Sequence, residues 1–188
     1  MRIIESGDKL YLNAGSAILK YNQGGNIESQ NNIVYPIADI QSKDIIDIAV
    51  SPDGQYLSAV SHLVLTGDTH ETVWTLHGTS ALNISKKIHR FGGSFDLYRT
   101  EFTAGSGYAI VCNPDPTIND DFYLMEIDSS TYRIKVLRQA VWGRPIFIDE
   151  PERMLLVYPV SDDGFKTTYN IIQTRELSEI LNAAQDLK

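Results

Sequence analysis

A β-hairpin pattern recurs four times along this sequence of 188 residues, and few folds can accommodate such a repeat. In the clearest copy, the alternating run Asp47–Val50 leads into the turn Pro52-Asp53-Gly54, and a second apolar run begins at Tyr56. Proline presets φ and glycine accepts a positive φ in turns of this kind, so the segment is predicted to form a hairpin. The same pattern occurs at Ile3–Leu12, Glu101–Val111 and Phe147–Val157.

The four copies are in register with one another. Their spacings are 46, 52 and 46 residues when the copies are aligned on Ile4, Val50, Phe102 and Ile148. Each copy is followed by a second strand-like run and further turn residues; these runs are Ala17–Tyr21, Thr72–Leu76, Phe122–Ile127 and Thr168–Ile172. The last run is followed by a predicted turn at Gln173-Thr174. We therefore expect four units of four antiparallel strands, a to d, within a single domain 1–188, with approximate bounds 1–43, 44–94, 95–140 and 141–188.

Two segments of the second unit carry a family resemblance. The segment Ser51–Leu57 resembles the a–b hairpin of WD-repeat β-propellers, and Val73–Thr79 is similar to their strand c. That strand usually ends in Trp-Asp, but Thr75 replaces the aspartate here, and no Gly-His pair precedes the units. The resemblance implies an all-β fold of β-propeller blades, whose stacking buries both faces of each sheet. The chain is either a closed four-bladed propeller, part of a larger ring completed by another chain or copy, or a piece of a longer protein; another all-β repeat or sandwich is the alternative fold.

The end of the sequence departs from the strand pattern. Leu177, Ile180, Leu181 and Ala184 follow the i, i+3, i+4, i+7 spacing of an amphipathic helix. A short C-terminal helix is therefore predicted over about Arg175–Leu187. It would dock on the open edge of the fourth unit or on a partner chain.

Charge and composition limit the cellular locations and the classes of binding partner that the sequence suggests. The formal net charge of −8 disfavours nucleic acid and anionic membranes as partners. Neither a signal peptide nor a long apolar run is visible in the sequence, which predicts a cytoplasmic or nuclear protein. Strand alternation predicts that certain side chains are buried, namely Tyr56, Trp74, Phe102, Cys112 and Ile148. Others are expected to be exposed, namely Lys87, Asp120 and Asp163.

No catalytic motif, cofactor site or metal site is predicted from the sequence. His70 and His77 lie seven positions apart, so a strand would direct them to opposite faces, and the histidines are expected in loops and at the surface. The acidic segment Asn113–Asp121 offers oxygen ligands but lacks the spacing of a known calcium loop, so it is interpreted as a solvated turn.

The charges of the predicted loops point to a binding face. The expected b–c loops are acidic, with Asp68 and Glu71 in the second unit, whereas the expected d–a segments are basic. Such segregated charge suits docking of a charged protein partner. Arginine and aromatic residues dominate binding hot spots. The predicted partner-binding residues are Lys86, Lys87, Arg90, Tyr98, Trp142 and Arg144.

The leading functional hypothesis is a non-enzymatic protein–protein interaction or scaffold module that binds through the b–c and d–a loops. The partner would be another protein, or another copy that completes a propeller ring. One alternative is a propeller-class enzyme such as a lactonase, glycosidase or lyase, which the apolar residues of the predicted innermost strands disfavour. The other alternative is a regulatory or sensor fragment of a larger multidomain protein.

Overall fold

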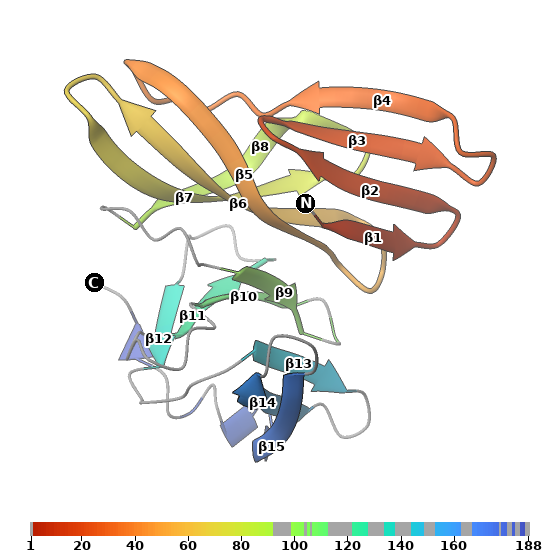
Figure 1. Ribbon diagram of the computed structural model, residues 1–188, viewed down its shortest axis with the longest axis vertical. Helices are drawn as coiled ribbons and strands as arrows, with labels where there is room; N and C mark the ends of the chain where they lie inside the picture. The colour runs from red at the N-terminus through yellow and green to blue at the C-terminus, as the bar shows by residue number, and fades with distance from the viewer. Residues whose placement is uncertain are drawn as a thin grey trace. The chain divides into compact units, whose positions relative to one another are not determined.

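The computed structural model describes residues 2–91, 99–103, 105, 107–112, 122–127, 134–137, 144–148, 153–162, 167–176, 178–179, 182 and 185–186. Within these residues the chain consists of β-strands in antiparallel sheets, apart from turns and a few helical residues near the end (Figure 1). The predicted all-β class is confirmed. The chain divides into two compact units, Met1–Thr100 and Glu101–Lys188.

The first unit contains two four-stranded sheets, each a meander of hairpins. The first sheet has the order β1 (Ile3–Ser6), β2 (Lys9–Ala14), β3 (Ala17–Asn22) and β4 (Ile27–Asn32). The second has the order β5 (Ile40–Val50), β6 (Tyr56–Leu65), β7 (Thr69–Gly78) and β8 (Ala81–Arg90). Figure 1 shows the longer strands of the second sheet running from orange to green. These sheets match the strands predicted for the first two units, although β5 begins before the expected boundary at residue 44.

The other two sheets depart from four strands each. The third contains β9 (Arg99–Phe102), β10 (Tyr108–Cys112), β11 (Phe122–Glu126) and β12 (Ile134–Leu137), and β16 (Gln185–Asp186) adds a fifth strand beside β12. The fourth has three described strands, β13 (Arg144–Ile148), β14 (Arg153–Asp162) and β15 (Thr167–Glu176). Four uniform blades are therefore not what the structure describes.

The C-terminal predictions are correct only in part. A turn at Gln173-Thr174 is wrong, because β15 keeps its pairing with β14 as far as Glu176. Ser178, Glu179 and Asn182 are helical, as predicted, whereas Leu177, Ile180, Leu181 and Ala184 lie outside the described residues. The predicted helix also extends too far, since Gln185 and Asp186 pair with β12. This pairing supplies backbone hydrogen bonds to a sheet edge, which a helix cannot do.

The hairpin turns predicted between the first two strands of a unit form where the structure describes them. At Pro52-Asp53-Gly54, the Ser51 N–H donates to the Tyr56 carbonyl at 2.9 Å, and the Gly54 N–H donates to the Ser51 carbonyl at 2.8 Å. Gly54 has φ +71°, the left-handed conformation that favours glycine. In the third sheet the Thr103 N–H donates to the Tyr108 carbonyl at 2.9 Å, closing the turn that contains Gly105. The turn predicted at 150–152 lies outside the described residues, although Ile148 and Arg153 pair across it.

The core of the first unit lies between its two sheets and includes the connection that joins them. Its buried side chains come from both sheets and from residues 33–35, and they are Tyr11, Ile18, Ile33, Tyr35, Ile45, Ile48, Leu57, Ala59, Leu63, Val73 and Leu82. Burial raises the pKa of Tyr35 to about 12, and its hydroxyl donates to Ser61 Oγ at 2.5 Å. This pairing satisfies the phenol inside the core.

Two of the predicted exposures are wrong. Trp74 and Phe102 are buried as predicted, but Tyr56 is only half-buried, because it lies at the first position of β6 beside the turn. Lys87 is half-buried instead of exposed, because it is opposite Leu76 inside a paired strand instead of in a loop. Four of the predicted exposures are not tested. The described part of the structure does not include the side chains of Cys112 and Ile148, nor the residues Asp120 and Asp163.

We expect Gly54→Ala to lower the free energy of unfolding by about 1–2 kcal/mol, because an alanine is strained at φ +71°. Gly107→Ala is the matched control, because Gly107 has no positive φ and no atom within 4 Å of an added Cβ. Urea denaturation of the full chain measures both variants. Equal stability of the two variants would contradict the turn assignment.

Candidate interaction surface

A chain of buried hydrogen bonds fixes Trp74, the residue that carries part of the sequence resemblance. Its indole N–H donates to Ser58 Oγ at 2.7 Å, and the Ser58 and Thr100 hydroxyls lie 2.6 Å apart. The Thr100 N–H in turn donates to Asp47 Oδ2 at 2.9 Å. The first step joins the neighbouring strands β7 and β6, and the other two join residues 42 and 53 positions apart, so these bonds position β5, β6 and β7.

Asp47 is the charged end of this chain of bonds. Its carboxylate accepts a hydrogen bond from Arg2 Nη1 at 2.8 Å, and the same Nη1 donates to the Thr100 carbonyl at 3.1 Å. The Arg2 N–H bonds the Asn13 side-chain oxygen, and the Asn13 amide donates to the Ile45 carbonyl at 2.9 Å. Because the buried carboxylate is paired in this way, we assign it a structural role.

A polar groove runs along the end of the first unit where the turns β1–β2, β5–β6 and β7–β8 lie. It consists of two hollows of about 340 Å³ each, which share Lys20 and Thr79. One hollow is lined by β4 and by residues 79–83, and the other by residues 6–9 and by the turn 52–54. We call this feature the turn-end groove.

Thr79 joins the β7–β8 turn to the β5–β6 turn of the second sheet at the middle of the groove. Its N–H donates to the Gln55 carbonyl at 3.0 Å, and its hydroxyl donates to the Gly54 carbonyl at 2.7 Å. Lys20 Nζ lies 3.5 Å from the Thr79 carbonyl and 5.9 Å from the centroid of the Tyr11 ring. A lysine of the first sheet thereby contacts a residue of the second.

The charges that line the groove are of both signs and are paired. Lys9 Nζ lies 2.6 Å from Glu28 Oε1 and 3.2 Å from Asp8 Oδ2, and Glu28 Oε2 lies 3.9 Å from Lys20 Nζ. The hydrogen bonds that the Lys9 ammonium donates, first to Glu28 and then to Asp8, raise its pKa. Burial raises the pKa of Tyr11. A groove of this kind suits a polar chain better than a compact anion or an apolar small molecule.

The sequence-predicted binding residues do not share one loop. Residues 86–90 lie inside β8, since Lys87, His89 and Arg90 pair with Leu76, Trp74 and Val73. The expected d–a loop at residues 86–90 is wrong, because β8 stays paired with β7 as far as Arg90, the last residue of the strand.

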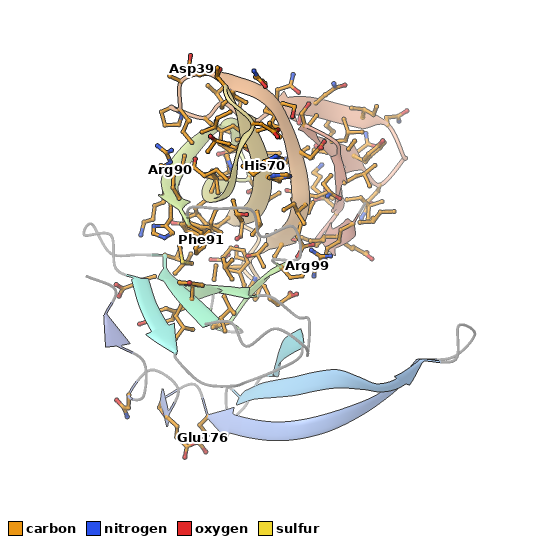
Figure 2. The ribbon with its side chains drawn as sticks, turned by 60° about the vertical axis from the view of Figure 1, so that its left-hand side comes forward. Asp39, His70, Arg90, Phe91, Arg99 and Glu176 are labelled. Carbon is orange, nitrogen blue, oxygen red and sulfur yellow. The ribbon has the colours of Figure 1, made fainter. Side chains whose placement is uncertain are left out.

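Lys86 and Arg90 lie toward different ends of the second sheet. Lys86 Nζ is 4.9 Å from the centroid of the Tyr56 ring, beside the β5–β6 turn. Arg90, labelled with Phe91 in Figure 2, forms a bidentate pair with Glu71, with its Nε 2.9 Å from both carboxylate oxygens. The Arg90 side chain remains 53% exposed.

The remaining site predictions are not tested. Tyr98, Trp142 and the segment 113–121 lie outside the described residues, and Arg144 is placed only as the first residue of β13. Whether any of the six predicted residues binds a partner stays a prediction.

The histidines differ from the surface positions expected for them. His77 is buried, and its Nε2 lies 2.8 Å from the Thr75 hydroxyl. His62 and His70 are neighbours, with His62 Nε2 2.9 Å from His70 Nδ1. The hairpin register places both on one face of the sheet, because His70 is opposite Val64 and His62 is two residues before it. That register could have identified the pair from the sequence.

No family model matches the chain, and no curated protein matches it. Among solved structures it is similar to one titled "Structure of U3-55K", at 10% identity and a TM-score of 0.32; the match covers 84% of this chain and 61% of that chain. It is also similar to the β-propeller domain of Cps50 (Swd1) from Myceliophteria thermophila, at 10% identity and a TM-score of 0.29, over 92% of this chain and 73% of that one.

The chain spans about 61% of the length of the first of these structures. With TM-scores this low, neither likeness transfers a residue role. Within the described residues no helix has the length and apolar character needed to cross a bilayer.

Proposed function

We propose that this chain is a non-enzymatic protein-interaction module that holds an extended polar segment of another protein in the turn-end groove. The proposal rests on the groove itself. Polar groups from both sheets line it, and several are held in place by hydrogen bonds to other residues of the chain. Fixed donors and acceptors lower the entropy lost when a partner binds.

The two walls of the groove offer complementary chemistry to a peptide backbone. Ser29 and Asn31 come from β4, and the Asn31 amide is held by a 2.9 Å bond to the Ser29 hydroxyl. Ser80 and Asn83 come from the opposite wall. Hydroxyl and carboxamide groups both donate and accept, so they can bond N–H and C=O groups of an extended chain.

The enzyme alternative has weaker support in the same residues. Propeller-class catalysis would need polar side chains from several inner strands to converge on a substrate. In β5 the buried carboxylate of Asp47 is bonded to Arg2 and to the Thr100 N–H. Its strand neighbours Ile48 and Ala49 are buried and apolar.

We expect Asn83→Arg to reduce partner binding at least about tenfold, because it adds a long charged side chain to one wall of the groove. Asn32→Arg makes the same chemical change at an exposed position of β4 that does not line the groove. The measurement is quantitative mass spectrometry of proteins retained by each immobilised full-length variant, followed by affinity determination for the protein lost with Asn83→Arg.

Arg90→Glu serves as a third variant because it reports on the face predicted from the sequence. Loss of the partner with Asn83→Arg, and its retention with Asn32→Arg and Arg90→Glu, is the result we expect. Retention with Asn83→Arg would refute the groove, and loss with Arg90→Glu alone would move the binding face to the Glu71–Arg90 end of the sheet.

We also infer that a further β-sheet covers the outer face of the first sheet, and that a second copy of this chain can supply it. Ile3, Leu10 and Ile27 are 62%, 37% and 55% exposed. Leu10 and Ile27 lie on one face because both belong to the row of paired residues Glu5↔Leu10↔Tyr21↔Ile27, and Ile3 shares that face because it is two residues before Glu5 in β1. Tyr11 and Ile18 lie on the other face and are buried in the core. A sheet with two apolar faces is stable when both are covered, as in stacked propeller blades.

The native mass of the full chain tests this association. We expect a multiple of the 21.1 kDa chain mass, and we expect Leu10→Lys to shift the protein to the monomer. Val34→Lys is the matched control, because Val34 is 64% exposed outside the sheets and should leave the mass unchanged. A monomeric wild-type chain would contradict association between copies.

A further inference from the structure

The two histidines that flank the β6–β7 turn share a hydrogen bond that involves ring nitrogens of both. His62 Nε2 lies 2.9 Å from His70 Nδ1, and the rings are stacked with centroids 5.0 Å apart and an interplanar angle of 23° (Figure 2 labels His70). The His70 side chain is 38% exposed, so a solvated ion can reach the pair from the surface. Nothing in the proposed interaction function uses these residues.

Asp68 defines which nitrogen of His70 is available as a ligand. Its Oδ1 lies 3.3 Å from His70 Nε2, on the side of the ring away from His62. A proton on Nε2 that is donated to this carboxylate leaves a lone pair on Nδ1, which then accepts the N–H of His62. A carboxylate that holds the distal N–H of a histidine is the usual outer partner of a metal-bound imidazole.

We propose that His62 Nε2 and His70 Nδ1 form a binding site for a divalent late transition-metal ion, Cu²⁺ foremost, with Asp68 as the outer partner of His70. The ion takes the place of the shared proton. His62 transfers its proton from Nε2 to Nδ1 through solvent, so both imidazoles remain neutral and no net proton is released.

The two nitrogens lie close enough to occupy adjacent positions of one ion. Both rings must turn to bind one ion, because in the hydrogen bond their axes lie nearly along the line between the nitrogens. With metal–nitrogen bonds of about 2.0–2.1 Å, a separation that stays near 2.9 Å then subtends close to a right angle at the metal. Adjacent positions of a square-planar or tetragonal ion have this angle, and such geometry is typical of Cu²⁺ and Ni²⁺. Copper also stands highest in the general order of divalent affinities.

The site would retain positions for water. Among the described residues, no group of three or more His, Cys, Asp or Glu side chains is arranged to hold a metal ion. The two nitrogens therefore supply the protein ligands, and solvent completes the coordination. Because the ligands lie on neighbouring strands of one hairpin, a bound ion would cross-link β6 and β7 beside their turn.

The test is titration of the full chain with Cu²⁺ in a non-coordinating buffer, followed by calorimetry. One equivalent should bind to the wild-type chain. His62→Gln and His70→Gln should each weaken binding more than Asp68→Asn does, and Asp68→Asn itself should weaken it about 10- to 100-fold. His89→Gln, the matched control, should bind as wild type, because His89 packs edge-on against Phe91 elsewhere on β8.

Electron paramagnetic resonance of the wild-type complex provides a readout that does not depend on any variant folding. We expect hyperfine coupling to two equatorial nitrogens. Coupling to fewer nitrogens, absence of binding, or unchanged affinity in His62→Gln or His70→Gln would overturn the proposal.

Discussion

The buried carboxylate of Asp47 is the group on which the first unit depends. It accepts hydrogen bonds from Arg2, 45 residues earlier in the sequence, and from the Thr100 N–H, 53 residues later. A buried charge is tolerated only when it is paired, so the strands must assemble in an arrangement that brings these donors to it. The Thr100 hydroxyl then continues the chain of bonds through Ser58 to Trp74, and thereby fixes the centre of the second sheet.

Local signals explain why the hairpins could be predicted from the sequence and the long-range contacts could not. Pro52-Asp53-Gly54 encodes its turn within a few residues, and strand alternation identified Trp74 and Phe102 as buried. The pairing of β16 with β12 joins segments far apart in the chain, and no local propensity encodes it. The helix predicted from the spacing of Leu177 and Ile180 therefore extended into residues that form a strand.

The candidate sites also differ in whether a local sequence pattern could predict them. Lys20 and Thr79 meet in the turn-end groove although they are 59 residues apart, so no motif in the sequence could reveal the groove. Lys86 was expected in a d–a segment from the phase of the repeat, but β8 continues through it. His62 and His70, by contrast, are predictable once the hairpin register is known, because diagonal neighbours across two strands lie on one face.

A double-mutant cycle on Arg2→Met and Asp47→Asn tests most directly whether this buried pair organises the first unit. The free energy of unfolding of the full chain would be measured in urea for the wild type, both single variants and the double variant. We predict that each single change destabilises the fold and that the two are coupled by about 1–3 kcal/mol, because either change leaves its partner without its charge. Additive effects, with no coupling between Arg2 and Asp47, would contradict this account.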